Sequence, residues 1–201
     1  MAPQTLAPWA ELVPEQAGPI TAVELLHRHD DGWRYELVEG RLVRMAPAGF
    51  DHGNIESGLD TSLRSFVVAR SLGSVVAGDT GFTLSRPGEQ DTVLGADIAF
   101  VRAERLPPPG SLERRGFLRL APDLVVEVAS PDQYHPEMAE KARVWLAAGV
   151  RLLWLIWPRS KEVELWRAGS DIPVATLGDS DTLDGLDVVP GFVYAVRRLF
   201  E

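Results

Sequence analysis

The sequence has no cysteine, no long apolar run and no leader-like start. Without thiols, the 201 residues can form neither disulfides nor thiolate zinc sites, which is typical of a reducing compartment. No apolar segment approaches the roughly 20 residues that cross a bilayer. The start MAPQTLAPWAEL lacks the basic and apolar regions of a secretion signal. We therefore expect a cytoplasmic protein without membrane contact.

Lysine is scarce, and basic residues are outnumbered by acidic ones. Of 20 Lys plus Arg, only Lys141 and Lys161 are lysines, and 29 Asp plus Glu give a formal net charge of -9. Where arginine is the default cation, a retained lysine indicates a need for a compact ammonium with a tunable pKa. The acidic total argues against the broad basic surface that usually gives affinity for nucleic acid.

Two apolar runs each contain a single carboxylate. The run 94–101 holds Asp97, and the run Leu124–Val128 holds Glu127. Branched residues without polar alternation predict strands that are buried on both faces. An ionised carboxylate there costs several kcal/mol unless a cation or hydrogen-bond donors meet it. If the two strands pair, the carboxylates can converge and hold a divalent cation, which prefers oxygen ligands.

The helix that we expect after Glu127 supplies a cation. Pro136 suits the start of this helix and Gly149 suits its C-cap. Lys141 lies beside the apolar stripe between them. Two acids on adjacent strands and one lysine form the minimum set for holding a metal ion and orienting a nucleophilic water at a phosphodiester. The simpler alternative is a surface pair of Lys141 with Glu137, worth roughly a few tenths of a kcal/mol.

Four segments between residues 33 and 200 carry a family resemblance. They are YELVEGRLVRMAPAGFDHG, GADIAFV, APDLVVEVASP and EKARVWLAAGVRLLWLIWP. In these segments the chain resembles the large bacterial Uma-type family of endonucleases. That family belongs to the PD-(D/E)xK superfamily, which has the restriction-endonuclease-like fold. The resemblance implies a hydrolase that depends on Mg²⁺ or Mn²⁺ and cleaves phosphodiester bonds of DNA.

The resemblance also assigns roles to residues. Asp97 takes the acid of the first half-motif, and Glu127 takes the acid of the second. The chain departs from the superfamily pattern at Ala96, where the motif has proline, and at Ala129, where it has lysine. Proline supplies no ligand, so the first departure is tolerable. The second implies that the catalytic lysine has moved, and Lys141 is the candidate.

Further polar residues recur on the helix that we expect after residue 50. His52, Glu56 and Asp60 repeat every four residues and so share one face. In the family that the chain resembles, a histidine near the start of this helix is recurrent, and superfamily members often add an acid from their first core helix. His52 and Glu56 are therefore additional site candidates, with a solvated polar face as the alternative. Glu36 and Glu39, in the preceding hairpin, are further possible contributors, although we expect them to be hairpin residues that face water.

The segment between the two acidic strands is rich in arginine. It could reach over the site and contact DNA phosphates, or it could be a solvated connection that balances an acidic surface. These candidate DNA contacts are Arg102, Arg105, Arg114, Arg115 and Arg119.

The order of elements predicts the fold class. A helix, three strands, a helix and a strand give an α/β (α+β) fold with a restriction-endonuclease-like core, in which helices flank a mixed β-sheet. A hairpin that turns at Glu39 and Gly40 precedes the core, and a hairpin of 162–166 with 174–177 follows it.

One domain over residues 20–201 is expected from the length, with an extended arm over 1–19. This arm could pack on a neighbouring molecule through Trp9 and Leu12. Four tryptophans between Trp145 and Trp166 indicate a large apolar surface. Core packing is the default interpretation of these tryptophans, and a homodimer interface is the alternative.

Three hypotheses follow. The first is a Mg²⁺- or Mn²⁺-dependent endonuclease in which Asp97, Glu127 and the backbone carbonyl of Val128 hold the ion. Lys141 would then orient or deprotonate the attacking water. The second is a catalytically inactive binding or accessory protein with a nuclease fold, which the acidic charge and the missing strand lysine favour. The third is a structural ion pair, Asp97 with Lys141 or Glu127 with Arg143, in an unrelated domain.

Overall fold

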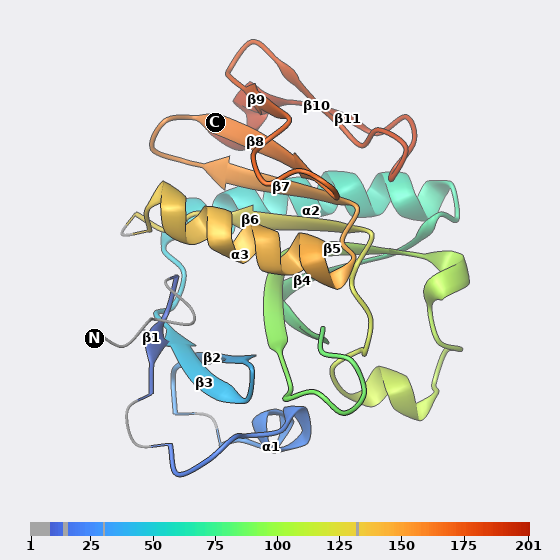
Figure 1. Ribbon diagram of the computed structural model, residues 1–201. Coiled ribbons are helices and arrows are strands. Elements are labelled where there is room, and N and C mark those ends of the chain that lie inside the picture. Colours follow the sequence, from blue (N-terminus) through green and yellow to red (C-terminus); the bar gives the residue numbers. More distant parts are fainter. Residues whose placement is uncertain (1–8, 14–15, 30, 132) are drawn as a thin grey trace.

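The computed structural model describes residues 9–13, 16–29, 31–131 and 133–201. A mixed sheet lies between helices (Figure 1), which confirms the α+β class that the sequence predicts. The strands are β1 (Glu11–Leu12), β2 (Arg34–Val38), β3 (Arg41–Met45), β4 (Gly73–Thr83), β5 (Val93–Arg102), β6 (Leu124–Val128), β7 (Leu152–Trp157), β8 (Glu162–Arg167), β9 (Ala175–Leu177), β10 (Thr182–Asp184) and β11 (Val193–Ala195). The helices are α1 (Ala22–Leu26), α2 (Phe50–Ala69) and α3 (His135–Ala148), with 3-10 turns η1 (Ala103–Arg105), η2 (Leu112–Arg115) and η3 (Val196–Leu199).

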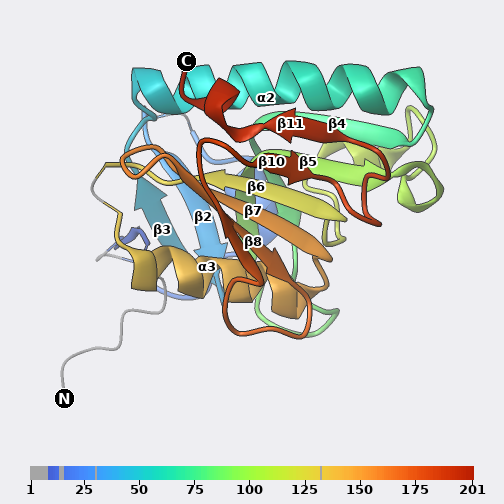
Figure 2. The same ribbon diagram turned by 90° about the horizontal axis from the view of Figure 1, so that it is seen from above.

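Helices α2 and α3 cover opposite faces of the sheet (Figure 2). Successive strand residues point to opposite faces, so Val126 packs in the core on the α2 side and Val125 packs in the core on the α3 side. The hairpin of β10 and β11 adds Leu183 and Tyr194 to the α2 side. Within the described residues, none of the helices is both long and apolar enough to cross a membrane.

Strand β5 has three neighbours, and this leaves a fork in the sheet. Strand β4 runs along one edge of β5. Strands β2 and β6 share the other edge, where Leu37 lies opposite Val93 and Val126 lies opposite Ile98. Residues 94–97 of β5 lie between these two contacts, where the described strands form no regular ladder on this edge. We call this gap the β2/β6 fork.

Local sequence explains the two turns that shape this region. Glu39 and Gly40 have φ angles of 49° and 71°, the two positive values that a two-residue hairpin turn requires. The predicted hairpin of β2 and β3 is thus confirmed. Gly78 and Asp79, with φ of 75° and 56°, form a bulge in β4, where the register with β5 shifts.

Part of the expected N-terminal arm joins the sheet. Residues Glu11 and Leu12 form β1 and pair with β3. Trp9 is buried in the core on the α3 side, where Leu12 also packs. These residues contact the chain's own sheet. Residues 1–8 and 14–15 of the expected arm lie outside the described residues.

The tryptophan-rich stretch belongs to the core. Trp145, Trp154, Trp157 and Trp166 are all buried on α3, β7 and β8. The default interpretation, core packing, is therefore confirmed. Strands β8 and β9 pair as the predicted C-terminal hairpin.

Candidate active site

Two carboxylates reach into the β2/β6 fork and bind backbone groups there. Asp97 on β5 accepts a hydrogen bond from the Val128 backbone N–H through Oδ2 at 2.7 Å. Glu36 on β2 accepts one from the Gly95 backbone N–H through Oε1 at 2.9 Å. A buried N–H without a partner is costly, so the acids satisfy donors that regular strand pairing would otherwise satisfy. Asp97 and Glu36 occupy these positions because β2 and β6 diverge along the edge of β5.

Lys141 projects from α3 into the same place. Its Nζ lies 2.9 Å from Oε2 of Glu127 and 3.2 Å from Oε1 of Glu36, and the residue is only 3% exposed. Each carboxylate also accepts an indole N–H. Trp145 donates to Oε1 of Glu127 at 2.8 Å, and Trp9 donates to Oε2 of Glu36 at 3.1 Å. One ammonium therefore joins two carboxylates, and a tryptophan holds each of them.

Burial and charge act in opposite directions on this network. Desolvation raises the pKa of Glu127 to about 8, against the attraction of Lys141 and with added repulsion from Asp97 and Glu36. Desolvation alone would lower the pKa of Lys141, but the three carboxylates outweigh it and raise that pKa above its ordinary value. Lys141 therefore keeps its charge, while Glu127 is the carboxyl that can take up a proton near neutral pH.

A second cluster shares Asp97. One ligand atom from each of His52, Glu56 and Asp97 lies within 4.8 Å of the others. The first turns of α2 carry His52 and Glu56, and the bulge in β4 fixes the latter, because the Gly78 backbone N–H donates to Oε1 of Glu56 at 2.7 Å. Nε2 of His52 lies 3.1 Å from Oδ1 of Asp97. Neither ring nitrogen, however, makes a hydrogen bond of acceptable geometry with a described residue.

The same competition sets the charges of this cluster. Burial would raise the pKa of Asp97, but His52, Lys141 and the Val128 N–H outweigh it, so the pKa is lowered. Burial would lower the pKa of His52, but the nearby Asp97 carboxylate raises it. The pKa of Glu56 is raised by burial, with Asp97 adding to the effect. Asp97 is thus the ionised centre of the site.

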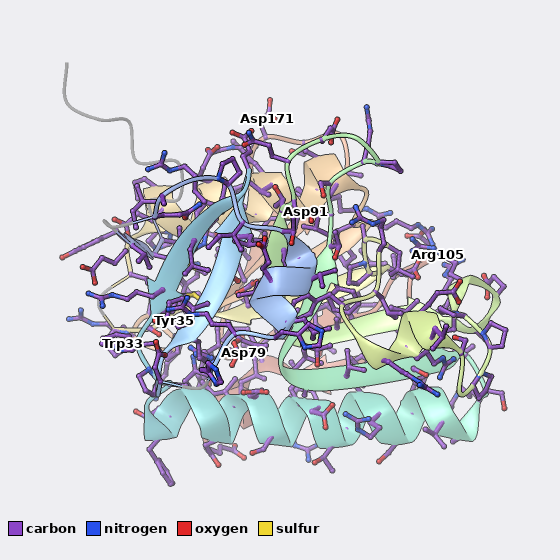
Figure 3. The ribbon with its side chains drawn as sticks, turned by 90° about the horizontal axis from the view of Figure 1, so that it is seen from below. Trp33, Tyr35, Asp79, Asp91, Arg105 and Asp171 are labelled. Carbon is purple, nitrogen blue, oxygen red and sulfur yellow. The ribbon has the colours of Figure 1, made fainter. Side chains whose placement is uncertain are left out.

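The two clusters open into a cleft of about 380 Å³. Its mouth carries Trp33 and two arginines, both already paired. Arg34 forms an ion pair with Asp79 of the β4 bulge. Arg44 stacks 4.6 Å from the centroid of the Trp33 ring and pairs with Glu11. Figure 3 shows Trp33 and Asp79 near the N-terminal part of α2. The residues lining the cleft include Trp9, Trp33, Arg34, Arg44, His52, Asp79, Asp97, Glu127, Val128 and Lys141.

Comparison with known proteins decides the family. A family model described as "Uma2: Putative restriction endonuclease" matches residues 22–197. The chain belongs to the Uma2 family. It also resembles a crystal structure described as "a putative nuclease belonging to DUF820 from Anabaena variabilis ATCC 29413", with a TM-score of 0.72 and 22% identity over 90% of this chain and 98% of that one. No curated protein matches it. The likeness to the crystal structure shows the fold, and the family indicates a nuclease.

In this Uma2 chain the arginine-rich segment lies away from the cleft. Arg105 pairs with buried Asp123 at 2.9 Å, and Arg119 pairs with Asp91 at 3.2 Å. Arg114 donates to the carbonyl of Pro107. Figure 3 shows Arg105 well away from Trp33 and Asp79. None of the five candidate arginines lines the cleft, so the structure does not bring them to the site.

The structure also tests what the sequence predicted for the acids and for Lys141. The structure brings together Asp97, Glu127 and Lys141, with Val128 beside them. The backbone N–H of Val128 donates a hydrogen bond to Asp97. The surface-pair alternative is wrong, because Lys141 turns to the sheet and is buried. Within α3, Arg143 pairs with Glu140 at 3.0 Å, so it does not support the Glu127 pair of the third hypothesis.

Sequence reasoning missed or ranked too low several contributors. Glu36 was a possible contributor that we expected to face water, but it is 1% exposed, so the expectation that it faces water is wrong. A signal was present, since strand alternation places Glu36 on the same face as Val38, which lies in the core. Trp9, Trp145 and Asp79 gave no comparable signal. Their roles depend on pairing and on a bulge that bring distant segments together.

Proposed function

We propose that the chain is a metal-dependent endonuclease that hydrolyses phosphodiester bonds of DNA, with Asp97, Glu127 and Lys141 as its site residues. The buried Lys141 ammonium, 2.9 Å from Glu127 and in the same cleft as Asp97, carries this proposal. Buried ionisable groups with displaced pKa values in a cleft are typical of active sites. Family membership supports the nuclease class. DNA as the substrate and a divalent ion as the cofactor are our extension of it.

The residues present fit a divalent ion. Asp97 and Glu56 offer carboxylate oxygens, and buried His52 offers ring nitrogens without well-aligned hydrogen bonds among the described residues. Mg²⁺ and Mn²⁺ both bind such oxygens. When bound, the ion would polarise a phosphoryl oxygen and lower the pKa of a water molecule.

The protein side chains then have distinct tasks. Because the pKa of Lys141 is raised, its ammonium stays charged; it orients the attacking water and offsets negative charge in the transition state, and does not deprotonate the water. Glu127 and Glu36 fix the position of this ammonium. Trp9 and Trp145 hold these two carboxylates in place, since both indoles are buried and each donates a hydrogen bond to one of them.

One observation favours a second candidate function. Lys141 and Trp145 already contact both oxygens of Glu127, and the cleft arginines are paired with acids. The net charge of the chain is also -9, so the described residues of the cleft offer little free positive charge for phosphates. A catalytically inactive binding or accessory protein with a nuclease fold is the alternative.

Plasmid cleavage distinguishes the two. Purified protein is incubated with supercoiled plasmid and Mg²⁺ or Mn²⁺, and nicked and linear products are measured. We expect cleavage by the wild type and by Lys161→Met, which removes the chain's other, exposed lysine, but none by Lys141→Met or Asp97→Asn. Plasmid binding without cleavage by folded wild-type protein would overturn the proposal in favour of the accessory protein.

A further inference from the structure

We propose that His52, Glu56 and Asp97 form the metal site, that this site selects a first-row transition ion such as Mn²⁺ over Mg²⁺, and that Glu127 positions Lys141 and does not bind the ion. The inference rests on the proposed nuclease function only where it assigns the ion to catalysis. The site itself can be tested without any substrate.

The first observation is the geometry of the three side chains. Their ligand atoms lie within 4.8 Å of one another although α2 and β5 are separate elements. The bulge in β4 anchors Glu56 through the Gly78 N–H, and the Val128 N–H anchors Asp97. Both anchors use one carboxylate oxygen and leave the other available to a ligand. The cluster is thus held in place by groups outside it.

The second observation is the state of His52. Its side chain is 6% exposed, and neither ring nitrogen makes a hydrogen bond of acceptable geometry with a described residue. Buried polar groups are nearly always satisfied, and an exception calls for an explanation such as a missing ion. An ion between His52, Glu56 and Asp97 would use the ring nitrogen nearest to Asp97. The competing explanation is a simple imidazolium paired with Asp97 across their 3.1 Å separation.

The third observation concerns Glu127. Its Oε2 lies 2.9 Å from the Lys141 ammonium, and its Oε1 accepts the Trp145 indole N–H at 2.8 Å. To enter a metal site, Glu127 would have to give up one of these buried contacts. Losing the first would also leave the ammonium with Glu36 as its nearest acid, at 3.2 Å. Glu127 is therefore a positioning residue that acts through Lys141.

The ligand types decide which ion is favoured. Mg²⁺ demands an octahedron of hard oxygen ligands and keeps several of its waters. An imidazole nitrogen suits first-row transition ions, and Mn²⁺ also accepts carboxylates. A set of one imidazole and two carboxylates therefore favours Mn²⁺ over Mg²⁺. Two acids alone would give a weaker preference.

Binding of Mn²⁺ to the metal-free protein tests the site directly. Electron paramagnetic resonance measures free Mn²⁺ during a titration, competition gives the Mg²⁺ affinity, and electron spin echo modulation detects a directly bound ¹⁴N nucleus. We expect Mn²⁺ to bind at least about tenfold more tightly than Mg²⁺. We also expect a nitrogen modulation that disappears in His52→Gln.

Matched variants locate the ligands. His52→Gln and Glu56→Gln should each weaken Mn²⁺ binding by about tenfold or more, and glutamine at 56 can still accept the Gly78 N–H. Asp60→Asn, one turn further along α2 and paired with Arg64, is the control and should bind like the wild type. Glu127→Gln should keep Mn²⁺ affinity within about threefold while plasmid cleavage falls. Thermal melting without ion confirms that each variant is folded.

The possible failures are separable. Equal affinity for both ions, absence of the nitrogen signal, or Mn²⁺ binding lost in Glu127→Gln but kept in His52→Gln would overturn this inference. Cleavage that persists in any of these cases would leave the proposed nuclease standing. Conversely, Mn²⁺ bound through His52 without cleavage under any ion would support the site and overturn the proposed function.

Discussion

The middle of β5 and the segment that follows this strand carry charge in different ways. Around Asp97, the charged groups are buried and depend on one another, with Glu127 and Lys141 only 4% and 3% exposed. Beyond Arg102, the arginines lie at the surface, where Arg105 pairs with buried Asp123 and Arg119 pairs with Asp91. A single charge in an apolar run is therefore a better guide to a functional site than a cluster of charges in a loop.

The physical reason is the cost of burial. Removing one member of a buried pair leaves the other uncompensated, which costs about 3 to 5 kcal/mol. A solvent-exposed pair contributes about 0 to 1 kcal/mol, because water screens both charges. A buried charge therefore persists only with a compensating partner, whereas a surface charge needs no specific role. The following predictions test this contrast.

The largest effect should come from removing the cation of the cleft. Lys141→Met leaves Glu127 and Glu36 buried without their shared ammonium, so we expect the free energy of unfolding to fall by about 3 to 5 kcal/mol. Urea denaturation of the metal-free protein measures it. Lys161→Met, at an exposed position, is the control and should change stability by less than about 0.5 kcal/mol. A Lys141→Met protein as stable as wild type would show that the buried network is not mutually dependent.

The pH dependence of stability should reveal the raised pKa of Glu127. Because burial raises its pKa to about 8 in the folded state from a model value of 4.5, the folded protein binds this proton more tightly than the unfolded chain. The stabilisation is fully present below the unfolded-state value of 4.5 and is lost as the pH rises towards about 8. Glu127→Gln removes the titrating group.

Urea denaturation at intervals between pH 5 and pH 9 would test it. The free energy of unfolding of Glu127→Gln should decline less steeply than that of the wild type, by at most about 1.4 kcal/mol per pH unit. The slope is the readout, because the amide also changes the contacts with Lys141 and Trp145 at every pH. Parallel slopes for the two proteins would contradict a raised pKa at Glu127.

The buried charges of the site and the fold class could be predicted from the sequence, because both depend on local patterns. Asp97, Glu127 and Lys141 were found because local patterns reveal buried strands and a helix, and because a charge inside such a pattern demands a partner. The structure places all three in one cleft. The fold class followed from the order of elements in the same way.

What could not be predicted depends on non-local pairing. Glu36 contributes because β2 and β6 share one edge of β5, a relation that no short segment encodes. Trp9 contributes because β1 joins β3. Asp79 reaches the cleft through the bulge in β4, and no local pattern fixes the direction in which its side chain points.

A smaller effect is expected at Trp9. Trp9→Phe keeps an aromatic ring in the core but removes the indole N–H that Glu36 accepts at 3.1 Å. Leaving a buried acceptor short of one donor costs about 1 to 3 kcal/mol, which urea denaturation can measure. Trp33→Phe is the matched control, because Trp33 is 43% exposed. Equal losses in the two variants would mean that packing, not the hydrogen bond, holds this segment.

The smallest effect should come from the arginine-rich segment. The double change Arg114→Ala and Arg115→Ala removes two positive charges from an exposed 3-10 turn that does not line the cleft. We expect the affinity of the Asp97→Asn protein for a DNA duplex, followed by fluorescence anisotropy, to change by less than about twofold when this double change is added. Phosphate contacts would act otherwise, since each releases counterions and steepens the dependence of affinity on salt. A salt slope reduced by about 2 in the double variant would place this segment on the DNA and remove the contrast between it and the middle of β5.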